Sequence, residues 1–366
     1  MDLTEARVPH YLRERDILDG RRVVDVQGVT RRGFCATIEL DDGTRWFLKQ
    51  ARRPREEQGE QLVADVAVAN EAAVLEWARR ATAGTPIRSL MPGFVVFDPD
   101  HQVLITEYLA EYRTLADHFQ RRAVFGRAIA QRLAEHLARC HAIRPDDHLA
   151  SGGRISTIHV IEQPLVTTWG HLGPEQIAAQ PDAFVEFVEL VQNTDGLNEA
   201  LREIRANWRP QCLIHGDAKF DNVLLRPSLG RRVPDLRLVD WELAGWGDPA
   251  WDAGTVIGGY LHQWLESISP TTSGTLNEWL AHAEVPFERV QPALGAFWAI
   301  YAHRRSTWGD PPDAARAISY AGVFLLHRAL ATVLFYGSLS AKALCSLQVA
   351  KRLIRQPSDT VSSLLC

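Results

Sequence analysis

One segment constrains the fold of this 366-residue chain more than any other. Residues 212–226 read CLIHGDAKFDNVLLR, with a short apolar run on each side of a polar loop. A further apolar run, LRLVDWE at 236–242, follows a turn-prone stretch between Pro227 and Pro234. Short apolar runs bounded by Gly, Pro, Asn and Asp are typical of buried strands joined by loops. The segment therefore predicts strands that hold a polar loop in a fixed position.

The polar loop carries a spaced set of charged and amide side chains. It reads HGDAKFDN at 215–222, and Asp240 follows at the end of the next apolar run. The spacing H-x-D-x-K-x-x-N is that of a kinase catalytic loop, in which one carboxylate accepts the proton of the attacking hydroxyl group. We predict this role for Asp217, and metal binding by Asn222 and Asp240. Lys219 is predicted to neutralise charge on the transferred group.

The first hundred or so residues predict a small antiparallel sheet with one main helix. Asp42 and Gly43 separate two apolar runs, which is a strong signal for a hairpin. A helix is expected around Val68, Ala72 and Leu75, which recur at spacings of three and four. Lys49 falls at the end of the third strand. The expected strands are 23–26, 35–40, 45–50, 94–98 and 103–109.

The remainder of the chain predicts mostly helices. An amphipathic helix is expected from Val124 to His141, and the pattern beyond Pro249 is almost entirely helical. We therefore predict an α+β fold of two lobes, a small N-lobe at 1–109 and a larger helical C-lobe at 110–366.

The longest apolar stretch, Tyr320–Leu339, has His327 and Arg328 in its middle. Charged groups at that depth are costly in a bilayer, so a buried helix is expected.

At the loop residues, the sequence resembles the aminoglycoside phosphotransferase and choline kinase-like family. Its members share the protein-kinase fold and read H-G-D where protein kinases usually read H-R-D. The resemblance covers nearly the whole chain, with its motifs densest between His215 and Asp252. It implies ATP and Mg²⁺ as cofactors and a substrate that bears a hydroxyl group. We therefore expect a kinase, which transfers the γ-phosphate of ATP to an alcohol group.

The resemblance also implies roles for residues in the N-lobe. Lys49 resembles the third-strand lysine that pairs with the α- and β-phosphates of the nucleotide, and Glu71 resembles its helix partner. Glu60 and Glu76 are alternatives for that partner. A full G-x-G-x-x-G motif is missing from the phosphate-covering loop VQGVTRRGF at 26–34, where Arg31 or Arg32 could contact phosphate or be solvated.

Four more residues are assigned through the resemblance. Glu107 and Tyr108 fall where the hinge between the lobes offers backbone groups to adenine. Asp252 resembles the buried aspartate that braces the catalytic loop. His215 is expected to be a packed histidine that fixes the loop, rather than a base.

The acceptor is harder to predict, because a fold does not specify its acceptor pocket. From Ser267 to the end, the sequence has nine Lys or Arg residues and six Asp or Glu residues. This positive balance disfavours a polycationic aminoglycoside as the acceptor. Residues 239–268 also resemble stand-alone bacterial kinases of class V lanthipeptide and thioamitide pathways. Those kinases phosphorylate Ser or Thr of a ribosomally synthesised precursor peptide, and a partner lyase then eliminates the phosphate.

Peptide phosphorylation is therefore the first prediction, with an acidic leader bound by Arg304, Arg305 or Arg352. A kinase of an antibiotic, a sugar or an amino alcohol is an alternative. A third hypothesis is a catalytically silent binding module that keeps the kinase fold.

Composition excludes several other classes of protein. The formal net charge is -5 and the sequence pI is near 6.2, so no binding to nucleic acid is expected. Five scattered cysteines read as reduced thiols. The N-terminal sequence has no apolar signal region, and we expect a cytoplasmic protein without a membrane partner.

Overall fold

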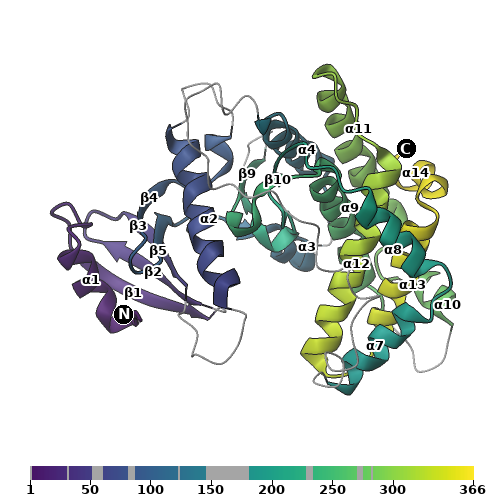
Figure 1. Ribbon diagram of the computed structural model, residues 1–366, viewed down its shortest axis with the longest axis horizontal. Coiled ribbons are helices and arrows are strands. Elements are labelled where there is room, and N and C mark those ends of the chain that lie inside the picture. The colour runs from purple at the N-terminus through teal and green to yellow at the C-terminus, as the bar shows by residue number, and fades with distance from the viewer. Residues whose placement is uncertain are drawn as a thin grey trace. The chain divides into compact units, whose positions relative to one another are not determined.

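The computed structural model describes residues 2–30, 33–51, 61–80, 87–122, 124–145, 181–227, 234–269, 275–281 and 283–366. These residues form two compact units, whose elements are labelled in Figure 1. The first unit runs to Arg113 and also includes Arg237–Ala244. The second unit holds the other described residues.

The first unit is built on a five-stranded antiparallel sheet. Its order is β1-β2-β3-β5-β4, and the Asp-Gly hairpin joins β2 to β3 as predicted. Gly43 has a φ of 80°, a left-handed conformation that glycine adopts without a steric penalty. The strands are β1 (Val23–Thr30), β2 (Phe34–Leu40), β3 (Arg45–Gln50), β4 (Phe94–Asp98) and β5 (Val103–Glu107).

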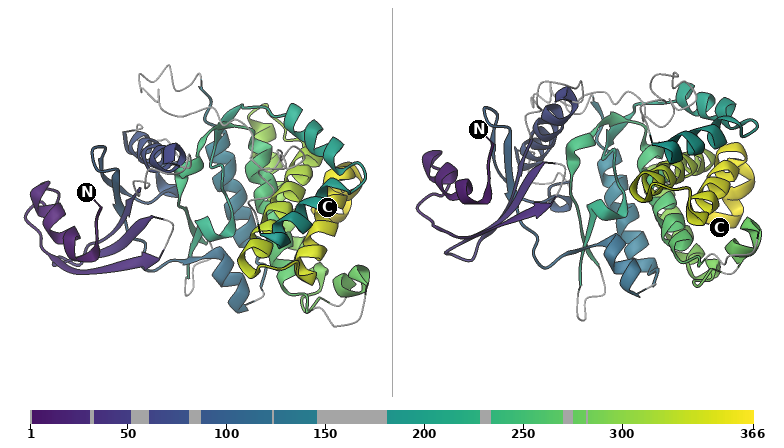
Figure 2. Two further views of the ribbon diagram at one scale, coloured as in Figure 1. Left: turned by 60° about the horizontal axis from the view of Figure 1, so that its bottom comes forward. Right: turned by 90° about the horizontal axis from the view of Figure 1, so that it is seen from below.

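The two faces of this sheet have different partners. On one face, Leu48 and Ile105 pack in a buried cluster with Tyr11 of α1 (Val8–Glu14), which follows η1 (Glu5–Arg7). Successive side chains of a strand point to opposite faces, so Lys49 points away from this cluster. Helix α2 (Gln61–Arg80) packs against β4 and β5, and Figure 2 shows it beside the strands. The alternation of side chains along β3 thus directs Lys49 away from α1.

The second unit is mostly helical, as the sequence predicts. Short strands β7 and β10 pair with each other, and a three-stranded sheet has the order β6-β8-β9. The strands of these sheets are β6 (Arg113–Thr114), β7 (Cys212–Ile214), β8 (Val223–Arg226), β9 (Asp235–Leu238) and β10 (Gly245–Gly247). The division between the units falls inside β6 and β9.

The helices of the second unit pack around α9 and α12, which lie side by side. They are α3 (Leu115–Arg122), α4 (Arg127–His141), α7 (Asp182–Gln192), α8 (Leu197–Ala206), α9 (Pro249–Glu266), α10 (Leu276–Ala281), α11 (Gln291–Thr307), α12 (Ala314–Tyr336), α13 (Ala341–Arg355) and α14 (Pro357–Leu365). The short 3₁₀ helices of the chain are η2 (Arg88–Leu90) and η5 (Trp241–Leu243) in the first unit, and η4 (Phe220–Asn222) and η6 (Phe287–Arg289) in the second.

Helix α12 contains most of the apolar stretch that the sequence analysis assigned to a buried helix. It is long and apolar enough to cross a membrane, but 61% of its most apolar window is buried inside the protein. It packs against α9 and α13 and ends at Gly337, whose φ is 66°. These contacts agree with the predicted buried helix.

Two glycines allow α9 and α12 to approach each other closely. A Cβ atom on Gly254 would lie 2.6 Å from the carbonyl oxygen of Ala317 and 2.6 Å from the Cβ of Tyr320. A Cβ on Gly258 would lie 2.6 Å from the ring of Phe324. Real Cβ atoms do not tolerate such distances, so any larger residue would push the two helices apart.

We predict that Gly254→Ala lowers the free energy of unfolding by about 1–3 kcal/mol, because it overpacks this helix pair. Urea denaturation measures the change. Gly295→Ala on α11 is the matched control, because its Cβ would lie 3.6 Å from the Leu365 carbonyl oxygen, an ordinary contact. The control should be neutral or stabilising by about 0.5–1 kcal/mol. Equal urea midpoints for Gly254→Ala and the wild type would contradict the prediction.

Candidate active site

The predicted catalytic loop lies in the second unit, between β7 and η4. Asp217 is held there by two of the residues that the sequence motif singles out. Lys219 Nζ lies 2.5 Å from Asp217 Oδ2. The side-chain amide of Asn222 donates to the same oxygen at 2.9 Å and to the Asp217 carbonyl oxygen at 3.0 Å. The loop thus gathers a carboxylate, an ammonium and an amide within hydrogen-bond distance.

Asp252, on the first turn of α9, fixes the start of this loop. Its carboxylate accepts the backbone N–H of His215 at 2.7 Å and that of Gly216 at 3.0 Å. Gly216 has a φ of 81°, and its carbonyl oxygen accepts from Trp251 Nε1 at 2.7 Å. A side chain at position 216 would strain this left-handed backbone, which explains why glycine follows the histidine.

His215 itself is fully buried. Its Nδ1 lies 3.3 Å from the backbone N–H of Asp217, which donates to it. The ring therefore contacts the backbone of the loop.

A second buried histidine supports Asp252 from behind. His141 Nε2 lies 3.1 Å from the Asp252 carboxylate, and its Nδ1 lies 2.8 Å from the hydroxyl of Tyr301. Burial lowers the pKa of His141, although its contact with Asp252 opposes this. Burial alone would raise the pKa of Asp252, but hydrogen bonds and nearby His141 and His215 outweigh it, so the net shift is downward. A neutral His141 thus donates to an ionised Asp252 and accepts from Tyr301.

The predicted nucleotide-binding lysine lies in the first unit, within a cluster of carboxylates. Lys49 Nζ is 3.0 Å from Glu71 Oε2, 2.6 Å from Asp240 Oδ1 and 2.5 Å from Glu242 Oε2. We call these four residues the Lys49 cluster. Burial opposes the charge of Lys49, but the three carboxylates overcome it, and the net effect raises the pKa of the ammonium. Burial raises the pKa of Glu71, although Lys49 counteracts it.

Helix α2 anchors the segment that carries Asp240. Buried Asn70 donates to the carbonyl oxygens of Glu242 at 3.0 Å and Ala244 at 2.8 Å, and Glu71 accepts from the Trp241 N–H. Asp240 has a φ of 66°, an uncommon conformation for a residue other than glycine. Such strain persists only where surrounding contacts enforce it, and it gathers at functional sites.

The donor set of the cluster fits a divalent cation. One oxygen each from Glu71, Asp240 and Glu242 lie within 4.8 Å of one another. Carboxylate oxygens are the ligands that Mg²⁺ prefers, and the Lys49 ammonium shows that they already surround a positive charge. Asn222, the other predicted ligand, belongs to the second unit.

Asn70 and Glu242 are not among the site residues that the sequence predicts. A polar residue next to Glu71 on an otherwise apolar helix, and a second acid two residues after Asp240, were the available signals.

Of the two predicted hinge residues, Glu107 is the last residue of β5 and Tyr108 follows it. The N–H of Glu107 donates to the Gly93 carbonyl oxygen at 2.8 Å, and that of Tyr108 donates to the Arg45 carbonyl oxygen at 3.0 Å. Both N–H groups are therefore used inside the first unit. An adenine ring that binds here would therefore have to donate to a backbone carbonyl oxygen of these residues, or accept from a backbone N–H group further along the chain.

The structure also distinguishes between the alternative partners that the sequence offers for Lys49. Glu76 pairs with Arg80 at 2.6 Å, and it is Glu71 that contacts Lys49. Glu60, Arg31 and Arg32 lie outside the described residues.

Helix α12 contributes charge close to the loop. Arg328 Nη1 lies 3.9 Å from Asp221, and its Nε donates to His262 at 3.2 Å. Burial and, to a smaller extent, the positive charge of Lys219 together lower the pKa of His327 to about 4. The apolar stretch of the sequence thus places its two ionisable residues beside the loop.

We predict that the free energy of unfolding falls as the pH drops from 6.5 toward 4. Burial, with Arg328 and Lys342, lowers the pKa of His262 to about 3, and His327 titrates near 4. In this range the unfolded chain binds protons that the folded chain does not, which costs up to about 1.4 kcal/mol per pH unit for each histidine. Urea denaturation at pH 5.5 and 7.5 measures the loss.

His262→Gln and His327→Gln should each reduce this pH dependence. His10→Gln is the control, because the side chain of His10 is 76% exposed. The prediction fails if both buried variants keep the full difference between the two pH values.

The fold and the site together define a kinase-like phosphotransferase. A family model described as "Phosphotransferase enzyme family" matches residues 36–292, which is more than half of the chain. The chain belongs to this family, so the predicted phosphotransferase is confirmed at the level of the family.

Solved structures support the same fold. A putative aminoglycoside phosphotransferase from Ralstonia eutropha is 16% identical, covers 98% of each chain and has a TM-score of 0.54. Choline kinase LicA from Streptococcus pneumoniae is 13% identical over 94% of this chain and 98% of that chain, with a TM-score of 0.52. The amicoumacin kinase hAmiN is 11% identical over 94% and 92%, also at 0.52. The predicted α+β kinase-like fold is confirmed.

Among curated proteins, a mouse protein named acyl-CoA dehydrogenase family member 11 is 26% identical over 103 residues. The match spans 28% of this chain and 12% of that protein.

Proposed function

We propose that this protein transfers the γ-phosphate of ATP, with Mg²⁺, to a hydroxyl group of a small molecule. The observation that carries the proposal is the arrangement of Asp217, whose carboxylate is held by Lys219 and Asn222 in a loop braced by buried Asp252. A fixed carboxylate in such a loop can accept the proton of an attacking hydroxyl group. The family match supports the same chemistry.

In this mechanism, Asp217 orients the acceptor hydroxyl and takes its proton as the new P–O bond forms. The bond between the γ-phosphorus and the bridging oxygen of ATP breaks at the same time, and ADP leaves with that oxygen. Lys219, next to Asp217, offsets negative charge on the transferred group. Asn222 holds Asp217 through its amide nitrogen, which makes its amide oxygen the candidate metal ligand. These residues do little covalent chemistry, since phosphoryl transfer depends mainly on position and charge.

The Lys49 cluster is the proposed binding site for the phosphates of the nucleotide and for the metal ion. Lys49 would bind phosphate oxygens, and Asp240 and Glu242 would hold Mg²⁺. Asn222 stays a predicted metal ligand. The metal ion would neutralise charge on the phosphates. The hAmiN kinase is in complex with AMP-PNP and Ca²⁺, which supports a nucleotide and a divalent cation for this fold. Glu107 and Tyr108 stay the predicted hinge.

The charges near the loop disfavour a polycationic acceptor. Lys219 pairs with Asp217 and Arg328 lies near Asp221, so these four charges balance, and burial keeps His327 uncharged at neutral pH. The structural relatives include a choline kinase, a putative aminoglycoside phosphotransferase and an amicoumacin kinase, which supports a small molecule as the acceptor.

A peptide acceptor has less support. Arg305, a predicted leader contact, is 2% exposed, donates to the His141 carbonyl oxygen and pairs with Asp310. The expectation is wrong for this residue, because a buried, paired guanidinium cannot receive a leader. Phosphorylation of a precursor peptide and a partner lyase stay predictions from the sequence, as does the cytoplasmic location.

We predict that Asp217→Asn lowers kcat by about 10² or more, because general base catalysis contributes on this scale. Its nucleotide affinity should be nearly unchanged. Asp240→Ala should instead weaken the binding of MgATP. Steady-state kinetics and calorimetric nucleotide titrations separate the two effects. Asp359→Asn, at an exposed position of α14, is the control. Full turnover in Asp217→Asn would exclude the proposed role of this carboxylate.

The acceptor is tested by mass spectrometry after incubation with ATP and Mg²⁺. Three pools are compared, namely neutral and anionic alcohols, polycationic aminocyclitols, and Ser/Thr-rich peptides. We expect one added phosphate in the first pool, and far less product in the same time with Asp217→Asn. Phosphate on a peptide alone would overturn the small-molecule proposal and restore the first prediction. If no pool gains phosphate although the protein binds ATP, the result would favour a catalytically silent binding module.

A further inference from the structure

The segment that precedes α1 connects two strands of the five-stranded sheet. Leu3 is 4% exposed, and its backbone N–H donates to Oε1 of buried Gln50 on β3 at 2.8 Å. Two residues later, Glu5 Oε1 accepts the backbone N–H of Gly28 on β1 at 2.9 Å. We call residues 3–5 the N-terminal bridge. It links β1 to β3, the strand that carries Lys49, through contacts outside the strand ladder.

The N-terminal bridge has a fixed position on the sheet. Leu3 belongs to the buried cluster that α1 forms with the sheet, together with Val8, Tyr11 and Leu12. These three side chains of α1 are at most 1% exposed. The side chain of Glu5 is itself exposed, but it extends from a segment that is anchored on both sides.

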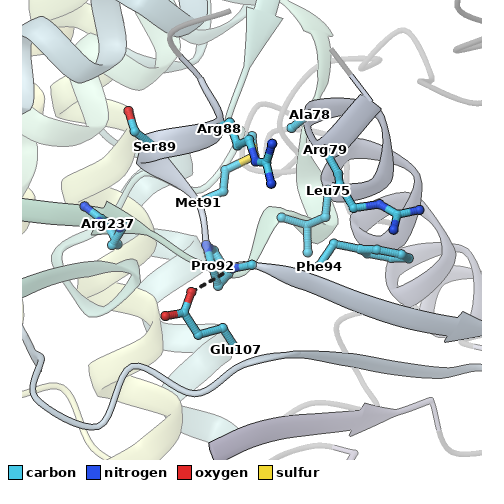
Figure 3. Close-up of a pocket in the computed structure, with 11 residues that line it drawn as sticks. Leu75, Ala78, Arg79, Arg88, Ser89, Met91, Pro92, Phe94, Glu107 and Arg237 are labelled. Atoms are coloured by element: carbon cyan, nitrogen blue, oxygen red, sulfur yellow. Dashed lines mark hydrogen bonds between the residues drawn. The ribbon is translucent and has the colours of Figure 1, made fainter. Parts of the chain in front are cut away.

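The partner strand β1 depends on contacts of this kind. It is an edge strand, which pairs with β2 on one side only. The outward N–H groups of an edge strand have no partner within the sheet. At the opposite edge, β4 packs against α2, and the Glu107 carboxylate accepts the N–H of Gly93 at 3.0 Å (Figure 3). At β1, η1 packs against the strand and Glu5 supplies the equivalent contact.

The absence of a side chain at position 28 makes room for the carboxylate. A Cβ atom on Gly28 would lie 2.2 Å from Glu5 Oε1, which is the free end of a flexible side chain. The φ of Gly28 is not positive, so alanine can adopt the same backbone conformation. Alanine would therefore displace the carboxylate of Glu5 and break its hydrogen bond, rather than distort the strand.

The register of the strands places this contact beside the Lys49 cluster. Val29 pairs with Cys35 of β2, and Cys35 pairs with Lys49 of β3. Paired residues point to the same face of a sheet, so Val29 lies on the face of Lys49 and Gly28 on the face of α1. Two strand spacings separate β1 from β3, which places the backbone of Val29 about 10 Å from that of Lys49. This part of β1 therefore borders the proposed phosphate site.

We propose that Glu5 is a positioning residue for nucleotide binding, which acts through Gly28. Its carboxylate holds the edge strand at a fixed distance from Lys49, so that β1 is already ordered when the nucleotide binds. Without this contact, binding would have to order the strand, and the entropy lost would weaken the affinity. The inference rests on the proposed function, because it takes Lys49 as a ligand of phosphate.

The test is calorimetric titration of the full chain with MgATP. Glu5→Ala should weaken binding about threefold to tenfold, the range expected for one hydrogen bond. Gly28→Ala should weaken it equally, and the double variant should bind no more weakly than either single variant, since both changes remove the same contact. Glu5→Gln should keep wild-type affinity, because its amide oxygen can still accept the N–H.

Hydrogen exchange without nucleotide provides a second measurement. Glu5→Ala and Gly28→Ala should both speed amide exchange in β1 relative to β5, because they release the edge strand. Glu14→Ala is the matched control, since this acid at the end of α1 is 62% exposed and lies near His10 of the same helix. The control should change neither the exchange rates nor the affinity for MgATP.

Three results would each overturn the inference while the proposed function stands. They are wild-type affinity and exchange in Glu5→Ala, a further loss of affinity in the double variant, and a loss in Glu5→Gln as large as that in Glu5→Ala. A wild-type chain that does not bind MgATP would instead overturn the proposed function, and this role of Glu5 with it.

Discussion

The candidate catalytic loop depends on one buried carboxylate. Asp252 accepts two consecutive backbone N–H groups, and a neutral His141 donates to it from the other side. A buried charge is stable only when its lone pairs are satisfied, and here backbone donors satisfy them. The conformation of the loop is therefore linked to the position of α9. Gly254 brings α9 close to α12, so the packing of these two helices helps to determine where Asp217 lies.

The Lys49 cluster follows from strand geometry and helix placement. Leu48 is buried against α1, which directs its neighbour Lys49 to the other face, and there the ammonium meets Glu71. The same helix binds the backbone of Glu242 through Asn70. One helix thus holds a carboxylate partner for Lys49 and positions two more carboxylates that are distant in sequence.

Much of this arrangement follows from the sequence. Some features depend only on residues that are close together in the sequence, and these can be predicted from local patterns. They are the hairpin at Gly43, the strand with Lys49 and the spacing from Asp217 to Asn222. Asn70 and the Arg305–Asp310 pair could not be found in this way, because their roles depend on contacts between distant segments. Charge counts were misleading for the same reason, since a count does not distinguish a buried, paired arginine from one at an acceptor site.

The Lys49 cluster contains three carboxylates and one ammonium, a surplus of negative charge in a mostly buried place. Under the proposed function, this surplus discriminates between forms of the cosubstrate. Free nucleotide is an anion and is repelled, whereas its complex with a divalent cation brings compensating charge. The enzyme would then recognise the metal complex as its true cosubstrate. The supply of divalent cation in the cell, as well as total ATP, would set its rate.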